Sequence, residues 1–192
     1  VRGLRLTRSG DSHDGVDAGL LLAGDDNLVE GNVIDDVLFG IHLRQGNRNR
    51  ILDNRVTGRP APRGARGDGL RLWNSRHNRI EGNAFKVVRD LTFANSPDNR
   101  ILGNTLTDGR YGMQFIFSPR ARVEGNRLAD TDTGIALVNV SYARSGPWII
   151  ISVRDHGPGV APEKLAQLTT PFRARYPDVS FRVQSCTSAD VL

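Results

Sequence analysis

Acid–base and charge-bearing side chains occur at matching places in several short apolar segments of this 192-residue chain. Four of them combine what sugar lyase or epimerase chemistry needs, a base together with charge neutralisation: His42, Asp68, Arg71 and Asp90. Of these, only His42 is a natural base near neutral pH, and it lies far from the carboxylates along the chain. We therefore expect recognition rather than catalysis, and we keep a polysaccharide lyase or epimerase as the alternative.

A larger polar set alternates with apolar residues in the same segments, as outward positions of a strand do. Its members are His42, Arg44, Arg71, Trp73, Thr92 and Gln114, with Tyr111 at the start of its segment. An aromatic face can stack on a sugar ring, and an arginine fork can bind a carboxylate at two points. An anionic glycan is the small ligand that this set favours.

These residues are positioned by a repeat of the form N-x-I/V-x-x-N-x-apolar. The second asparagine recurs at steps of 22, 29, 21 and 22 residues: Asn32, Asn54, Asn83, Asn104 and Asn126. One repeat is therefore about 22 residues, and the longer step contains a loop rich in Pro and Gly at 58–67. We expect the asparagines to lie at corners, in left-handed backbone conformations, with their amides paired between successive repeats.

Apolar residues recur in the same register, as in stacked short strands. Two inward columns are predicted, one of Val29, Ile51, Ile80, Ile101 and Val123, the other of Ile34, Val56, Phe85, Leu106 and Leu128. Further inward pairs follow a glycine, the last being Ile135 and Leu137 after Gly134. The pattern predicts an all-β, single-stranded, right-handed parallel β-helix of about six coils over residues 1–139, with a short non-repeat tail at 140–192.

One feature belongs to none of these sets. In four repeats the second position of the N-x-I/V-x-x-N motif is an arginine. The fold therefore stacks four guanidinium groups: Arg50, Arg79, Arg100 and Arg122. Glu30, Glu81 and Glu124 follow two residues after this column and offset part of the repulsion. The stripe is either a solvated face of mixed charge or a surface for an acidic partner or anionic headgroups.

Composition excludes several classes of protein. The net charge of +5 and the pI near 10.1 raise the question of nucleic acid, but arginines alternate with acids along the chain and no recognition helix or zinc spacing occurs. The single Cys186 excludes an intramolecular disulfide framework, and no apolar run predicts a transmembrane segment. The scattered histidines and Met113 form no copper cluster, so the sequence implies neither a metal site nor a cofactor.

The phrases at residues 67–83 and 89–138 resemble the NosD family of β-helix proteins, whose repeats are shared with carbohydrate-binding and sugar-hydrolase β-helices. The succession RDLTFANS to RYGMQFIFS carries the likeness to NosD itself. The resemblance implies a non-enzymatic periplasmic scaffold. It also implies that this scaffold works with a membrane ABC-type transporter and a copper enzyme, nitrous oxide reductase, in maturation of the copper centre.

The tail has a different likeness. From Trp148 onward the sequence is similar to the first glycine box of histidine-kinase ATPase domains. By that resemblance Asp155 would contact adenine, and Gly157 and Gly159 would let the backbone approach a nucleotide. The similarity covers only about residues 147–175 and lacks the magnesium-binding helix and the lid. It therefore predicts at most a truncated nucleotide-binding remnant.

Overall fold

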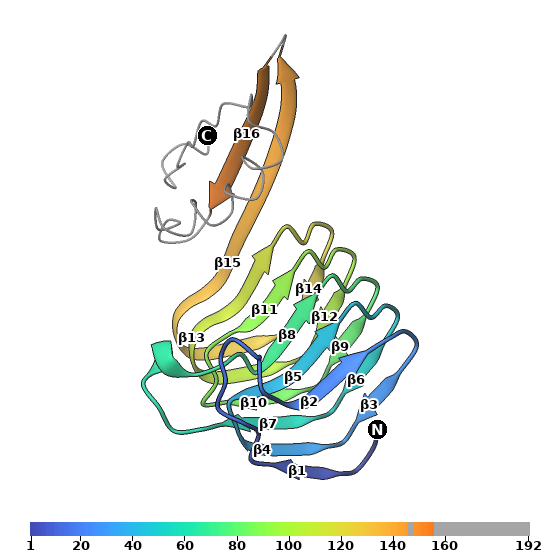
Figure 1. Cartoon of the computed structure of the whole chain (residues 1–192), viewed down its shortest axis with the longest axis vertical. Coiled ribbons are helices and arrows are strands. Elements are labelled where there is room, and N and C mark those ends of the chain that lie inside the picture. The colour runs from blue at the N-terminus through green and yellow to red at the C-terminus, as the bar shows by residue number, and fades with distance from the viewer. Residues whose placement is uncertain (146–147, 156–192) are drawn as a thin grey trace. The chain divides into compact units, whose positions relative to one another are not determined.

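The computed structural model describes residues 1–145 and 148–155, and residues 1–135 form strands that wind into stacked coils (Figure 1). No α-helix occurs in these two ranges, where the one helical turn is the 3₁₀ turn η1, Arg63–Ala65. Strands of neighbouring coils pair in parallel. The predicted parallel β-helix of about six coils is therefore confirmed.

Each coil contributes strands to three faces. The first face contains β1 (Arg5–Thr7), β4 (Val33–Val37), β7 (Arg55–Gly58) and β10 (Ala84–Lys86). The second contains β2 (Ala18–Ala23), β5 (Phe39–Arg44), β8 (Leu70–Trp73) and β11 (Leu91–Ala94). The long β13 (Thr105–Ile116) joins these two faces into one 11-stranded sheet. The third is a five-stranded sheet of β3 (Leu28–Glu30), β6 (Arg50–Leu52), β9 (Arg79–Glu81), β12 (Arg100–Leu102) and β14 (Arg122–Glu124).

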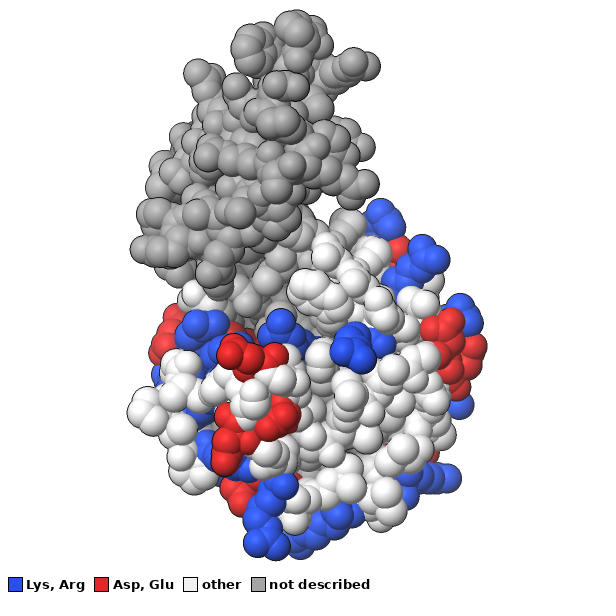
Figure 2. All heavy atoms as spheres, in the orientation of Figure 1, with Lys and Arg blue, Asp and Glu red and all other residues white. Residues whose placement is uncertain are grey.

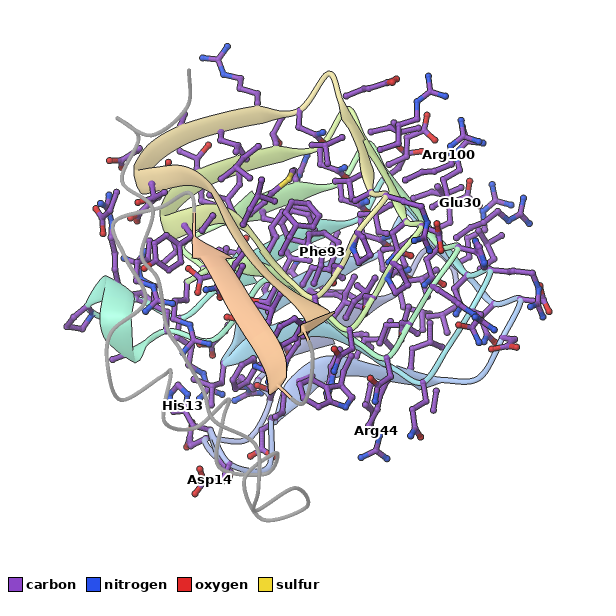
Figure 3. All side chains as sticks on the ribbon, turned by 90° about the horizontal axis from the view of Figure 1, so that it is seen from above. His13, Asp14, Glu30, Arg44, Phe93 and Arg100 are labelled. Carbon is purple, nitrogen blue, oxygen red and sulfur yellow. The ribbon has the colours of Figure 1, made fainter. Side chains whose placement is uncertain are left out.

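The core lies inside the coils, and both predicted inward columns are confirmed. Ile51, Ile80 and Ile101 are register partners with no exposed surface. The members at either end, such as Val123 and Leu128, are partly buried against the core. Phe93 and Phe115 stack at 4.8 Å between ring centroids, 9° from parallel, and Phe93 lies in the interior in Figure 3. Stacked apolar columns bury area in every coil, which stabilises the solenoid.

The last apolar pair does not join the core. Ile135 and Leu137, which were expected to face inward, are 43% and 37% exposed. In β15 (Arg127–Ser145) the buried residues are instead Ala136 and Val138, which are 4% and 7% exposed. Successive residues of a strand point to opposite sides, so Ile135 and Leu137 lie on the exposed side. That part of the sequence prediction is therefore wrong.

The asparagines form ladders through the solenoid, as predicted. Asn54 donates from Nδ2 and from its backbone N–H to Oδ1 of Asn83, at 2.9 Å each, and Asn83 donates in the same way to Asn104. A second ladder joins Asn27, Asn49, Asn78 and Asn99. Every buried amide in these ladders is satisfied, which is the condition for burying one.

The left-handed backbone lies one residue before the position that we expected. Positive φ angles occur at the residue preceding each asparagine of the first ladder: Gly31 (62°), Asp53 (53°), Gly82 (65°), Gly103 (60°) and Gly125 (63°). The chain bends at this preceding residue, so the asparagine itself can aim its amide along the solenoid axis toward the next coil. The expectation that the asparagines adopt αL is wrong for this reason.

A third ladder is built from serine. The backbone N–H of Ser75 donates to Ser96 Oγ at 3.1 Å, and that of Ser96 donates to Ser118 Oγ at 2.9 Å. The repeat contains the signal, because Ser75 and Ser96 each lie three residues before a ladder asparagine. Sequence reasoning missed this ladder, since isolated serines are common in turns.

The chain divides into two compact units, Val1–Ile135 and Ala136–Leu192. Within the second unit, the end of β15 pairs antiparallel with β16 (Trp148–Asp155), from Val138 opposite Asp155 to Ser145 opposite Trp148. In residues 1–145 and 148–155 we find no helix with the length and apolarity that crossing a membrane requires.

Candidate functional site

The predicted polar set gathers on the outside of the β2–β5–β8–β11–β13 face. We call His42, Arg44, Arg71, Trp73, Tyr111 and Gln114 the recognition face. His42 is the register partner of Arg71, Arg71 of Thr92, and Thr92 of Gln114. One position further along, Arg44 is the partner of Trp73. Residues more than twenty apart in sequence are therefore neighbours at about one strand spacing, roughly 4.8 Å.

Exposure divides this face into two rows. His42, Thr92 and Gln114 are largely buried, whereas Arg44 is exposed and Trp73 is 40% exposed. Burial lowers the pKa of His42, and the charges of Arg71 and Arg44 lower it further. His42 is therefore neutral at pH 7, with one nitrogen to donate and one to accept. The exposed row offers an aromatic ring beside a guanidinium.

The carboxylates proposed for catalysis are buried in an ion-pair network. Asp68 accepts from Arg89 at 2.7 Å and from Arg71 at 3.3 Å. Asp90 accepts from Arg110 at 2.6 Å and lies 3.3 Å from Arg89. Neither carboxylate has more than 1% of its side chain exposed. Arg89 therefore contacts both acids, and each acid also contacts a second arginine.

Burial raises the pKa of Asp68, while the charges of Arg89 and Arg71 oppose that rise. Asp90 also accepts a bond from the backbone N–H of Tyr111 at 2.9 Å, and Arg110 lies 4.5 Å from the centre of the Tyr111 ring. Sequence reasoning named the acids and missed Arg89 and Arg110. The signal was available, since Arg89 and Arg110 each immediately precede a residue that was singled out.

These contacts decide what the face can do. A general base must reach its substrate proton, but Asp68 and Asp90 are turned toward arginines and buried. His42 is paired in register with a cation, Arg71, rather than with an acid. The geometry therefore favours binding of a ligand over acid–base chemistry by the set His42, Asp68, Arg71 and Asp90.

The four arginines of the basic stripe, Arg50, Arg79, Arg100 and Arg122, are register partners in the five-stranded sheet. They are exposed, and Figure 3 shows Arg100 and Glu30 projecting outward. Arg79 pairs with Glu81, and Arg122 with Glu124 at 2.5 Å, whereas Glu30 pairs with Arg2 at 3.1 Å. Figure 2 accordingly shows acidic and basic side chains next to each other on the face in view.

The inserted loop is fastened to the solenoid by ion pairs. Arg63 contacts Asp108, Asp130 and Asp132 at 3.2, 2.8 and 2.6 Å. Arg66 donates to the same Asp108 at 2.9 Å. The loop begins in the coil of β7, yet it reaches carboxylates two and three coils away. Residues 58–67, which we call the strap, are therefore held against the coils by these ion pairs.

The described residues do not fit a copper centre. They contain no group of three or more His, Cys, Asp or Glu side chains placed to hold a metal ion. Met113 is fully buried in the core, and His13 packs edge-on to Phe39 at 5.6 Å. His156 and Cys186 lie outside the described residues, as do Gly157 and Gly159 of the predicted nucleotide remnant. Asp155 is the last residue of β16.

The fold defines a class of protein, a parallel β-helix whose outward side chains stack in columns from coil to coil. Within it, residues 52–145 match the family described as "Periplasmic copper-binding protein (NosD)". The chain is also 36% identical over 100 residues to the "Probable ABC transporter binding protein NosD" of Pseudomonas aeruginosa. That match covers 47% of this chain and 23% of the relative, so it spans less than a quarter of the relative's length.

No solved structure matches the chain. The likeness to NosD that the sequence predicts is nevertheless confirmed, over residues 52–145. The family is described as periplasmic and copper-binding, and the relative is named a probable ABC transporter binding protein.

Proposed function

We propose that this chain is a segment of a periplasmic β-helix scaffold that binds a membrane ABC-type transporter. In this role it assists copper delivery during maturation of nitrous oxide reductase and is not itself an enzyme. The observation that carries the proposal is the NosD match over residues 52–145, which runs from the last residue of β6 to the end of β15. The relative's name supplies the transporter as the partner.

The solenoid suits a scaffold for two reasons. Its interior polar groups are paired along continuous ladders, which fixes the outer side chains at regular positions. The carboxylates on the recognition side are engaged with arginines rather than free to react. Copper would then be the cargo of the assembly, held by other residues than the described ones.

The test is a pull-down of the full chain by the detergent-solubilised transporter of the nitrous oxide reductase maturation system. We expect retention at about 0.15 M salt, an ionic strength that screens nonspecific surface charge. Retention of the chain no greater than that of an unrelated β-helix protein would contradict the proposal.

A second candidate function rests on the exposed Trp73 beside Arg44. Ala94, the neighbour of Trp73 on the other side, is small, and within residues 1–145 and 148–155 the cation–aromatic contact is that of Arg110 with Tyr111, so it does not occupy the Trp73 ring. A ring with a guanidinium beside it suits a sugar that carries a carboxylate. We expect a uronate oligosaccharide to bind weakly if this candidate holds, and Trp73→Ala to abolish the signal on a glycan array. Unchanged binding by that variant would reject the candidate.

A further inference from the structure

We propose that the basic stripe is a docking surface for the acidic face of an α-helix in a protein partner. The stripe is separate from the recognition face, since it lies on the five-stranded sheet. The proposal does not depend on which protein the partner is, and it stands or falls separately from the transporter proposal.

The charge along the stripe is compensated in alternate coils. Arg79 and Arg122 have a glutamate two residues later, and each pairs with it. The residue two positions after the arginine is Leu52 in β6 and Leu102 in β12, and both leucines are register partners of Glu81. Arg50 and Arg100 consequently have no carboxylate within ion-pairing distance among the described residues. Two guanidinium groups without an ion pair, which we call uncompensated, therefore recur with a period of two coils. Glu81 and Glu124 attract Arg100 only at longer range.

This period matches a helix. Two coils of a β-helix advance by about 10 Å, twice the spacing between neighbouring strands. Two turns of an α-helix advance by about 11 Å, so residues i and i+7 face the same side at that distance. Carboxylates at i and i+7 of a helix laid along the solenoid axis would each meet one uncompensated arginine. Such charge-assisted pairs are stronger than neutral hydrogen bonds.

A protein fits the surroundings of these arginines better than a lipid membrane does. Leu52 and Leu102 are half-buried beside Arg50 and Arg100, and arginine next to apolar surface is typical of protein interfaces. Glu30, Glu81 and Glu124 form the adjacent column and would be repelled by a continuous anionic surface. A partner helix can instead place its own carboxylates only at the positions where arginine is uncompensated.

The experiment uses the full chain and a labelled helical peptide whose glutamates are spaced at i and i+7. A peptide of the same composition with its glutamates on opposite faces is the comparison. We expect fluorescence anisotropy to report binding of the in-phase peptide only. Arg50→Glu with Arg100→Glu should weaken that binding at least tenfold, and a peptide with lysine at i and i+7 should bind this variant instead.

The control variant is Arg55→Glu with Arg127→Glu, which changes net charge equally on exposed outward positions of the other sheet. It should alter binding less than twofold, and thermal melts should show that both variants fold. An equal loss of peptide affinity in both variants would overturn the proposal, because binding would then depend on net charge and not on the stripe. Equal binding of both peptides, or none by the unmodified chain, would also overturn it. Binding to phosphatidylglycerol vesicles with the same Arg50/Arg100 dependence and no peptide binding would assign the stripe to lipid.

Discussion

At the scale of single residues, the polar interior depends on asparagines whose amides bond the same amide in the next coil. Their identity and spacing were readable from the sequence, because asparagines that recur once per coil can pair their amides in a stack and so satisfy buried polar groups. The αL position one residue earlier was not predicted, since glycine and aspartate both occur there and neither alone marks the bend.

Asn83→Ala removes an interior member of the first ladder. It leaves the backbone N–H of Asn54 and the carbonyl of Ile51 without their partners inside the solenoid. We expect the free energy of unfolding to fall by about 2–3 kcal/mol, the cost of leaving buried polar groups unpaired. Urea unfolding measures this change.

Asn27→Ala is the matched control for that variant. Asn27 lies at the end of its ladder and donates partly to the exposed carbonyl of Asp25. Its loss should cost less than about 1 kcal/mol. Equal costs for the two variants would mean that ladder position is unimportant.

Arg89→Gln tests the buried ion pairs. It removes the cation between Asp68 and Asp90, which are both buried. We expect the free energy of unfolding to fall by about 3 kcal/mol at neutral pH, because a buried ion pair loses one partner. Burial already raises the pKa of Asp68, and loss of the Arg89 charge removes the largest influence that opposes this rise, so the folded-state pKa of Asp68 lies further above the unfolded value near 3.9. The folded variant then binds a proton more tightly than the unfolded chain does. The difference in the free energy of unfolding between the unmodified chain and the variant should therefore shrink as pH falls toward about 4.

Thermal unfolding of Arg89→Gln between about pH 4 and 8 measures this effect, with Arg89→Lys as the variant that keeps the charge. A deficit that is constant over this pH range would show that packing of the Arg89 side chain, not its charge, stabilises the network.

At the scale of elements, strand positions and their inward columns followed from the alternation of apolar residues, because the side-chain period of a strand is two. The loop at 58–67 was predicted from its Pro and Gly content. Its attachment was not, since Arg63 bonds Asp108, Asp130 and Asp132 across coils that only the folded stack brings together. The burial of Asp68 and Asp90 was missed for the same reason.

Arg63→Ala should release the strap while the coils stay folded. Ion pairs at the surface contribute little to global stability, but here three of them converge on one side chain. We expect faster hydrogen exchange in residues 59–67 and an unchanged melting temperature. Arg55→Ala, which removes an exposed arginine outside the loop, should leave that exchange unaltered. Unchanged exchange in Arg63→Ala would show that the loop is held by other contacts.

At the scale of the whole molecule, the solenoid of residues 1–135 presents its outward side chains in columns with about one strand spacing between neighbours, and the proposed binding surfaces are such columns. The sequence predicted which residues share a column, because the repeat fixes the register. Which column binds a partner depends on exposure and pairing. Only the folded chain shows that Arg44, Trp73, Arg50 and Arg100 remain open to a partner while Asp68 and Asp90 do not.

The most direct measurement is hydrogen–deuterium exchange of the full chain with and without the solubilised maturation transporter. We expect protection in the turns and outward strands of residues 1–135, because the β-helix is proposed to be the docking surface. Retention of the chain by the transporter without protection anywhere in residues 1–135 would contradict a scaffold role for the solenoid.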